Sequence, residues 1–416
     1  KTTYSGGSGG DSLTYNASAV SKAVSLGAGI DSIDISHSTS LTASIDGGAD
    51  SDRLTISSDL LSRVTTGSGR NLISNFESLV VTGDLSGQTI DLSRVGTIRS
   101  LDLTEGGSVN LTQVADSTDI ELFKAGGAYH ISNSAFTKGS NDSISISLSN
   151  RGNEVINYAP RGVTLQDVET AFIFAPFPNS SDANGSNFNI LDVRGNTLER
   201  IFVLGYSGLE LRSDSTTLTK VDFDNPRSTG ATFTAPALTR EASIIGVDKS
   251  NVVNTFDLSA AKAVITYTGG AGSDVIKVNG LLNQVNVGSS GLDHVTISAA
   301  GANSIAYTTI SNAHAGLTLS LPGAISSFAA DKIAPGNATV ALTLANAFVQ
   351  QSGNASTQAA TGWFQLDGNT WIVQSRHDAS GSNSGFLNGT DVLVKLTGLI
   401  DLSHAQVTAN YDLLLA

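Results

Sequence analysis

The sequence contains no cysteine, so disulfide bonds and thiolate metal sites are excluded. Charged residues make up only 14% of the chain, and small residues such as Ser, Thr, Asn, Gly and Ala take their place, as in stacked β architectures. No apolar run is long enough to span a bilayer, and we expect no transmembrane segment. Acidic residues outnumber basic ones by 37 to 23, which argues against nucleic acid as a partner and favours divalent cations.

The sequence contains little evidence of catalytic motifs. The six histidines do not form the H-E-x-x-H motif with which zinc proteases bind their metal from one face of a helix. Residues 6–10 (GGSGG) lie inside a glycine repeat and not on the strand-to-helix turn that carries a lipase nucleophile. A solenoid lyase or epimerase would need acids and bases clustered on one face, which a sequence alone does not place. We expect that the chain is not an enzyme.

One nonapeptide carries the strongest functional signal. Residues 269–277 (GGAGSDVIK) match all nine positions of G-G-x-G-x-D-x-U-x, where U is a large apolar residue. The glycines adopt backbone conformations that a side chain forbids, which lets their carbonyls turn toward a shared point. Asp274 supplies a carboxylate at that point, and several hard oxygens in a flexible arrangement suit Ca²⁺. Ile276 is expected to begin a short strand and to point inward.

The nonapeptide is followed by weaker copies at a spacing of nine or ten residues. Residues 288–295 (GSSGLDHV) repeat it with one glycine lost, and residues 301–305 (GANSI) repeat its second half. This spacing is half a turn of a parallel β-roll, so Asp274 and Asp293 are expected on one edge, with Asn283 and Asn303 on the other. The expected calcium ligands of this array are Gly269, Gly270, Gly272, Asp274, Asn283, Gly288, Gly291, Asp293 and Asn303.

A second array begins near residue 6. Residues 6–14 (GGSGGDSLT) match fully, residues 26–33 (LGAGIDSI) lack only the first glycine, and residues 47–54 (GGADSDRL) and 66–73 (TGSGRNLI) are variants. The sixth positions recur every 19 to 21 residues, which predicts one motif per full turn and all motifs on one edge. Ordinary Gly-Asp turns share the local pattern but do not explain two phased arrays. The expected ligands are Gly6, Gly7, Gly9, Asp11, Gly27, Gly29, Asp31, Gly47, Gly48, Asp50, Asp52 and Asn71.

Between the arrays the glycine motif fades, but a period of about 20 residues persists. Five segments read apolar, polar, polar, apolar and then alternate, at 76–81, 98–103, 168–173, 198–203 and 218–223. Each is predicted to start one coil of a parallel β-solenoid. Residues 176–182 are longer than a turn needs, and we expect this loop to make a contact outside the solenoid.

The last 76 residues change character. Residues 341–351 (ALTLANAFVQQ) predict a short helix, and Asp367-Gly368 is a hairpin turn signal between two segments that hold both tryptophans. Residues 391–396 predict a further strand. Because a solenoid leaves its last coil open, we expect these elements to form an aromatic cap.

The nonapeptides, the strand starts that carry Glu77 and Glu169, and the segments 363–365 (WFQ) and 391–399 (DVLVKLTGL) resemble the RTX-type calcium-binding surface-layer (S-layer) proteins of Gram-negative bacteria. The resemblance implies type I secretion through an uncleaved C-terminal signal, Ca²⁺-triggered folding outside the cell, and self-assembly into a two-dimensional lattice. In that family an N-terminal domain anchors the lattice to lipopolysaccharide. No segment here matches it, and we expect the anchor upstream of residue 1.

These observations predict an all-β chain built as a right-handed parallel β-solenoid, with several Ca²⁺ ions bound at RTX turns. Residues 1–74 form a first β-roll, 75–250 a solenoid with loop excursions, 251–340 a second β-roll, and 341–416 the cap and secretion signal region. The expected function is that of a secreted structural subunit of a cell-surface S-layer. The alternative is a calcium-stabilised cell-surface adhesin or extracellular matrix protein, which binds an external ligand.

Overall fold

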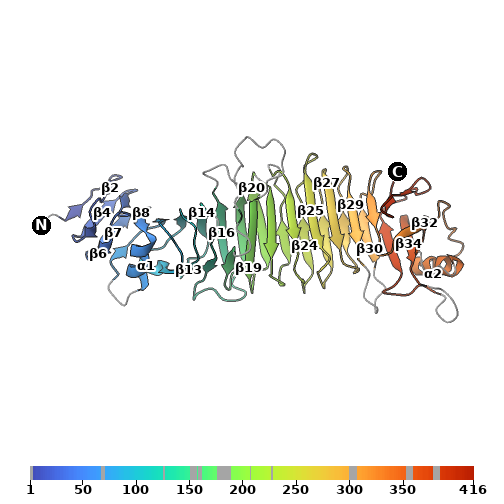
Figure 1. The fold of residues 1–416 in the computed structure, drawn as a ribbon, viewed down its shortest axis with the longest axis horizontal. Coiled ribbons are helices and arrows are strands. Elements are labelled where there is room, and N and C mark those ends of the chain that lie inside the picture. The colour runs from blue at the N-terminus through green and yellow to red at the C-terminus, as the bar shows by residue number, and fades with distance from the viewer. Residues whose placement is uncertain are drawn as a thin grey trace. The chain divides into compact units, whose positions relative to one another are not determined.

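The computed structural model describes residues 3–66, 71–124, 127–149, 157, 162–175, 189–206, 208–225, 228–298, 307–352, 359–377 and 385–416. They form a parallel β-solenoid that is nearly all β, in which strands of successive coils lie side by side (Figure 1). The chain divides into two compact units, Lys1–Ser215 and Thr216–Ala416. Within the described ranges, no helix is both long and apolar enough to cross a membrane.

The first unit contains one long parallel sheet, to which each coil contributes a strand. Its strands are β2 (Ser12–Thr14), β5 (Ser32–Asp34), β8 (Arg53–Ser57), β10 (Ser78–Thr82), β12 (Ser100–Leu103), β14 (Thr118–Leu122), β16 (Ser143–Leu148), β18 (Thr170–Ala175) and β20 (Arg200–Gly205).

Three further sets of strands complete the coils of the first unit. One sheet has β1 (Tyr4–Ser5), β4 (Val24–Ala28), β7 (Ile45–Ala49) and β9 (Ile73–Ser74). Another runs through β11 (Gln88–Asp91), β13 (Val109–Thr112), β15 (Tyr129–Ile131), β17 (Val163–Leu165), β19 (Asn189–Gly195) and β21 (Leu209–Ser213). The short strands β3 (Ala19–Val20) and β6 (Ser40–Leu41) pair with each other.

The second unit repeats the arrangement with two stacks of parallel strands. One stack is β22 (Lys220–Asp222), β24 (Ala242–Ile245), β26 (Ile265–Thr268), β28 (Gln284–Asn286) and β30 (Tyr307–Ser311). The other is β23 (Ala231–Thr234), β25 (Val253–Leu258), β27 (Ser273–Val278), β29 (His294–Ile297) and β31 (Thr318–Ser320).

The core of each coil comes from the alternation that the sequence predicts. Leu79 pairs with Leu101 and Val81 with Leu103 across β10 and β12, and all four side chains are buried. Each such side chain contributes about 1.5–3 kcal/mol on burial. The register confirms the predicted repeat, since neighbouring coils place the same position of the pattern inside the solenoid.

Two elements of the first unit fall outside the predicted repeat. Helix α1 (Ser58–Thr66) follows β8 directly and buries Leu60 and Leu61, while Ser58 Oγ donates to the Asp84 carbonyl at 2.6 Å. The 3-10 helix η1 (Leu92–Arg94) is capped by the Asp91 carboxylate. Helix α1 lengthens its coil, so Glu77 follows Asp52 by 25 residues, against 20 and 21 for the two preceding steps.

The end of the second unit contains the predicted helix and hairpin. Helix α2 (Ala341–Ser352) packs against a hairpin whose turn residues Asp367 and Gly368 both have positive φ, 50° and 73°, as a two-residue hairpin turn of this type requires. Strand β35 (Val392–Leu396) pairs antiparallel with β34 (Asn369–Ser375) and parallel with β30, which joins the hairpin to the solenoid sheet. The terminal strands are β32 (Ile325–Phe328), β33 (Ala359–Leu366), β34 (Asn369–Ser375), β35 (Val392–Leu396), β36 (Gln406–Val407) and β37 (Leu413–Leu414).

Candidate metal-binding turns

The glycine turns of the first unit stack directly on one another. They join β1 to β2, β4 to β5 and β7 to β8. Gly27 and Gly48 are in register, and their φ angles of 107° and 110° lie in the left-handed region that favours glycine. A Cβ on Gly48 would lie 1.9 Å from the Gly27 carbonyl oxygen, and one on Gly27 would lie 2.2 Å from that of Gly7. Glycine is therefore required for this close backbone stacking.

A column of acidic side chains follows these turns. The backbone N–H of Asp11 donates to Asp31 Oδ1 at 2.6 Å, and that of Asp31 donates to Asp52 Oδ1 at 2.9 Å. The N–H of Asp52 then donates to Glu77 Oε2 at 3.0 Å. Each carboxylate thus accepts a hydrogen bond from the preceding coil through one oxygen. This bond also fixes the direction in which its second oxygen points.

The second carboxylate oxygens of Asp31 and Asp52 are buried and accept no hydrogen bond. Both residues are almost completely buried. Burial raises the pKa of Asp52, and the negative charges of Asp31 and Glu77 raise it further, although the N–H of Asp31 opposes these effects. A Cβ on Gly47 would lie 2.9 Å from Asp52 Oδ2, so the free oxygen lies over the first glycine of its own turn.

The second unit contains the same arrangement at the nonapeptide. The N–H of Asp274 donates to Asp293 Oδ1 at 2.8 Å, and the Asn254 amide donates to Asp274 Oδ1 at 2.7 Å. Both aspartates are almost completely buried, and the Oδ2 of each accepts no hydrogen bond. A Cβ on Gly269 would lie 1.8 Å from Asp274 Oδ2. The free oxygen again lies over the first glycine of its turn.

Burial dominates the electrostatics of this site. It raises the pKa of Asp274 to about 7, with a further contribution from the charge of Asp293, while the hydrogen bond from Asn254 and the nearby Tyr267 hydroxyl and Gly270 N–H act in the opposite direction. Burial also raises the pKa of Asp293. A bound cation would reverse this effect, because it stabilises the ionised carboxylate.

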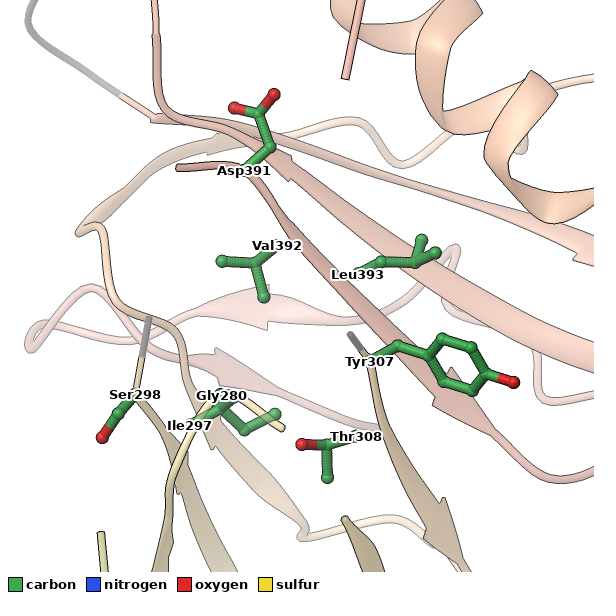
Figure 2. A pocket seen from close by; sticks show the side chains of 8 residues that line it. All are labelled: Gly280, Ile297, Ser298, Tyr307, Thr308, Asp391, Val392 and Leu393. Carbon is green, nitrogen blue, oxygen red and sulfur yellow. The ribbon is translucent and has the colours of Figure 1, made fainter. Parts of the chain in front are cut away.

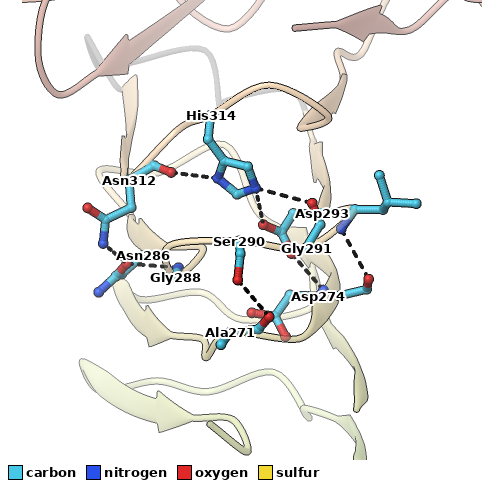
Figure 3. A network of polar contacts seen from close by, with 11 residues as sticks. Ala271, Asp274, Asn286, Gly288, Ser290, Gly291, Asp293, Asn312 and His314 are labelled. Atoms are coloured by element: carbon cyan, nitrogen blue, oxygen red, sulfur yellow. Dashed lines mark hydrogen bonds and ion pairs between the residues drawn. The ribbon is translucent and has the colours of Figure 1, made fainter. Parts of the chain in front are cut away.

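The remaining glycines of the C-terminal array also stack. Gly288 and Gly291 have φ of 79° and 126°, and a Cβ on them would lie 1.7 and 2.2 Å from the carbonyl oxygens of Gly270 and Gly272. Figure 3 shows how Ser290 Oγ donates to the Ala271 carbonyl and ties the two turns together. Backbone oxygens and the free carboxylates thus gather at one edge of the coils.

Several predicted ligands lie elsewhere or make other bonds. Asn283 Oδ1 accepts a hydrogen bond from the N–H of Ile265 at 2.9 Å, so this side-chain amide is bonded inside the coil. Asn71 precedes the start of β9, whereas the acidic column follows the ends of β4 and β7.

Other predicted ligands are more exposed or fall outside the described residues. Asp11 Oδ2 accepts the N–H of Gly7, and Asp50 Oδ2 accepts that of Gly29, each at 3.1 Å at a more exposed position. Asn303 lies outside the described residues, as does the loop at 176–182.

Two residues of the columns were not predicted as members. Glu77 continues the first column, but it lies 25 residues after Asp52 because α1 lengthens the coil. Asn254 begins the second column, 20 residues before Asp274, without a glycine motif of its own. Glu77 could have been found by its position directly before an alternating strand, since Asp52 occupies the same position before its own strand.

Two cavities in the described part of the chain lie away from the glycine turns. One beside Thr308 and Val392 has a volume of about 10 Å³, which is room for a single water molecule (Figure 2). The Oγ1 of Thr308 is buried there without a hydrogen-bond partner. A larger, open cavity of about 200 Å³ is lined by Asp192, Arg194, Arg212, Ser213 and Asp214.

The donor set at the turns is mainly backbone oxygen. Within the described ranges, no three His, Asp or Glu side chains gather closely enough to share an ion. The stacked turns instead present glycine carbonyls to the next coil, and buried carboxylate oxygens lie over the first glycine of the turns at Gly47 and Gly269. Oxygens of these two kinds are the ligands that Ca²⁺ prefers. No protein-family model matches the chain, and no curated protein matches it.

Proposed function

We propose that the chain is a structural subunit of a Ca²⁺-dependent bacterial surface layer. The observation that carries the proposal is the set of buried, unpartnered Oδ2 atoms of Asp31, Asp52 and Asp274 over stacked glycine turns. A buried carboxylate without a partner is strongly unfavourable, and a divalent cation removes that cost. Ca²⁺ takes about six to eight oxygen ligands at roughly 2.3–2.6 Å, which carbonyls of adjacent turns and solvent would complete.

A Ca²⁺ requirement fits folding outside the cell. The stacked carboxylates repel one another when no metal is bound, and the glycines lose much conformational entropy when they order. Type I secretion through a signal in residues 341–416 would export the chain unfolded, and external Ca²⁺ would then fold it. Anchoring to lipopolysaccharide would require a region other than the turns described here.

Assembly into a lattice requires contact surfaces between copies. Phe174 and Leu204 are in register on β18 and β20, and they are 41% and 44% exposed. Adjacent exposed apolar side chains are typical of interaction surfaces. The formal charge of −14 would keep copies apart until cations screen or bridge them.

The test is Ca²⁺-dependent assembly of the purified chain. We expect monomers in chelator, and ordered sheets by light scattering and negative-stain microscopy after millimolar Ca²⁺ is added. Excess chelator should dissolve the sheets. A chain that binds Ca²⁺ but stays monomeric would contradict the lattice function.

The second candidate is a calcium-stabilised adhesin or matrix protein. The open cavity of about 200 Å³ favours it, because Asp192, Arg194, Arg212 and Asp214 bring charges of both signs to its wall. Such a site would bind an external polar ligand rather than another copy. A Ca²⁺-saturated monomer that binds polysaccharide would support this candidate.

A further inference from the structure

His314 lies one coil beyond the glycine turn that ends at Asp293. It belongs to the turn between β30 and β31, which stack on β28 and β29. Its ring reaches back to the preceding turn, where Nε2 is 3.2 Å from the Gly291 carbonyl oxygen and 3.5 Å from Asp293 Oδ2 (Figure 3). The last turn of the array thus contains a nitrogen donor, which the other turns lack in their described parts.

The second ring nitrogen determines the tautomer of His314. Nδ1 is 2.8 Å from the Asn312 carbonyl oxygen, which only accepts, so Nδ1 carries a hydrogen and donates it. In a neutral ring, Nε2 then carries a lone pair. This lone pair faces two other acceptors, the Gly291 carbonyl and the Asp293 carboxylate. Three acceptors that face one another repel unless a proton or a metal cation lies between them.

The Asp293 oxygen at this point has the ring of His314 as its neighbour but accepts no hydrogen bond. Its side chain is fully buried, Oδ1 is occupied by the N–H of Asp274, and Oδ2 accepts no hydrogen bond. The side chain of His314 is 22% exposed, which leaves a route for an ion from solvent. A buried carboxylate oxygen and an oriented imidazole therefore converge at the edge of the solenoid.

The separations from His314 Nε2 to the two oxygens fit a small metal ion. Two donor atoms that each lie about 2.0–2.1 Å from a tetrahedral Zn²⁺ are about 3.3–3.4 Å apart. The observed distances from Nε2 are 3.2 and 3.5 Å. Imidazole suits Zn²⁺ and related transition metals, whereas Ca²⁺ takes oxygen ligands.

We propose that His314 Nε2, Asp293 Oδ2 and the Gly291 carbonyl bind a transition metal ion of the Zn²⁺ class, with water completing the coordination. The inference refines the proposed function, since it removes Asp293 from the Ca²⁺ ligands and gives one turn a different metal. The Nδ1 bond to Asn312 orients the imidazole in the way that outer partners orient other metal-binding histidines. A proton on Nε2 would satisfy the same contacts, and metal titration separates the two explanations.

The experiment is a Zn²⁺ titration of the full chain by calorimetry in millimolar Ca²⁺, which saturates the oxygen sites. We expect about one equivalent of Zn²⁺ to bind, and His314→Ala to weaken it at least tenfold, because loss of an outer partner alone costs 10–100-fold. Asp293→Asn should weaken it similarly while keeping an acceptor for the N–H of Asp274. His404→Ala, at an exposed histidine beside Asp401, is the matched control and should bind as wild type.

Co²⁺ gives a second readout that does not depend on stability. The wild-type chain should show the visible bands of a low-coordinate nitrogen and oxygen site, and His314→Ala should lose them while circular dichroism confirms that it folds. Equal Zn²⁺ affinity in wild type and His314→Ala, or no Zn²⁺ binding by wild type, would overturn the assignment. A Ca²⁺ titration of the same samples separates this outcome from failure of the Ca²⁺ proposal.

Discussion

Asp52 accepts the backbone N–H of Asp31 through Oδ1 at 2.9 Å and leaves its Oδ2 buried without a hydrogen bond. The same relationship joins Asp293 to Asp274 in the second unit, at 2.8 Å. One oxygen of each acid fixes the coil spacing, so the other is presented to the glycine turn in a set direction. In the metal-free protein these carboxylates are buried with one oxygen lacking a hydrogen bond, and we therefore expect its stability to depend on cations.

Asp274→Asn should change stability in opposite directions with and without Ca²⁺. In chelator, removal of the buried carboxylate should raise the free energy of unfolding by about 1–3 kcal/mol. In Ca²⁺, the variant should lose the gain from its ion, which is about 2.7 kcal/mol at a hundredfold excess over Kd. Thermal unfolding under both conditions measures this. Thr219→Ala is the control, and equal Ca²⁺ responses of wild type and Asp274→Asn would contradict the ligand assignment.

The metal-free protein should lose stability as pH rises through the range set by Asp274. Its pKa is about 7 in the folded state and 3.8 ordinarily. Between these values the folded state holds a proton that the unfolded chain has released, so the free energy of unfolding falls as pH rises. The contribution is fully present below about pH 4 and lost by about pH 7.

Burial also raises the pKa values of Asp52 and Asp293, so the difference between wild type and Asp274→Asn isolates the effect of Asp274. Denaturant unfolding in chelator at several pH values should give a difference that changes steadily through this window. Excess Ca²⁺ should reverse the slope for wild type, because metal binding requires the ionised carboxylate. A difference independent of pH in chelator would count against a buried, uncompensated Asp274.

Chelation should loosen the glycine turns before the central coils. We expect the turns to rely on a cation for charge compensation, whereas β18 and β20 are held by buried apolar side chains such as Ile173 and Ile201. Hydrogen exchange should therefore rise in peptides around Asp31 and Asp274 and stay low in β18 and β20. Circular dichroism and exchange that do not change in excess chelator would contradict a structural role for Ca²⁺.

Glu77→Ala should weaken Ca²⁺ binding by the first array while its glycines stay unchanged. Glu77 accepts the N–H of Asp52, and its loss leaves a buried donor unsatisfied at a cost of about 1–3 kcal/mol. Because Asp52 is then less well held, Ca²⁺ affinity of the first unit should fall about tenfold. Glu121→Ala, on β14 outside the column, is the control. A titration in which both variants match wild type would remove Glu77 from the site.

Replacement of Phe174 and Leu204 by serine should block assembly and leave Ca²⁺ binding intact. Both side chains are exposed and in register, so the change costs the folded monomer little. Light scattering in Ca²⁺ should stay at the monomer level, while the calcium isotherm matches wild type. Leu399→Ser removes another exposed apolar side chain and should still assemble. Normal sheets from the double variant would exclude this surface as a contact.

Local pattern predicted the fold well where each coil repeats it. Alternating apolar residues placed Leu79, Leu101 and Ile201 inside, and the Asp367-Gly368 pair gave the hairpin turn. Helix α1 was not predicted, because the glycine motif expected at 66–73 overlaps its last residue, Thr66. The nine-residue helix α1 makes its coil longer than the others, so positions counted by a fixed spacing no longer match across it.

The sequence predicted the acidic residues of the candidate site but not the hydrogen bonds that connect them. The sixth position of the motif identified Asp31, Asp52, Asp274 and Asp293, because the glycines before it mark the turn. Spacing did not reveal that each acid binds the N–H of its neighbour, since that requires the register of the coils. It also assigned Asn283 to a metal, although its amide serves Ile265 in the coil interior.

The most direct test is a crystal structure in saturating Ca²⁺, with anomalous scattering to identify the ions. The account predicts Ca²⁺ about 2.3–2.6 Å from the Oδ2 atoms of Asp31, Asp52 and Asp274, with glycine carbonyls of adjacent turns as further ligands. Density without an ion at these oxygens, each hydrogen-bonded to water or protein instead, would contradict it.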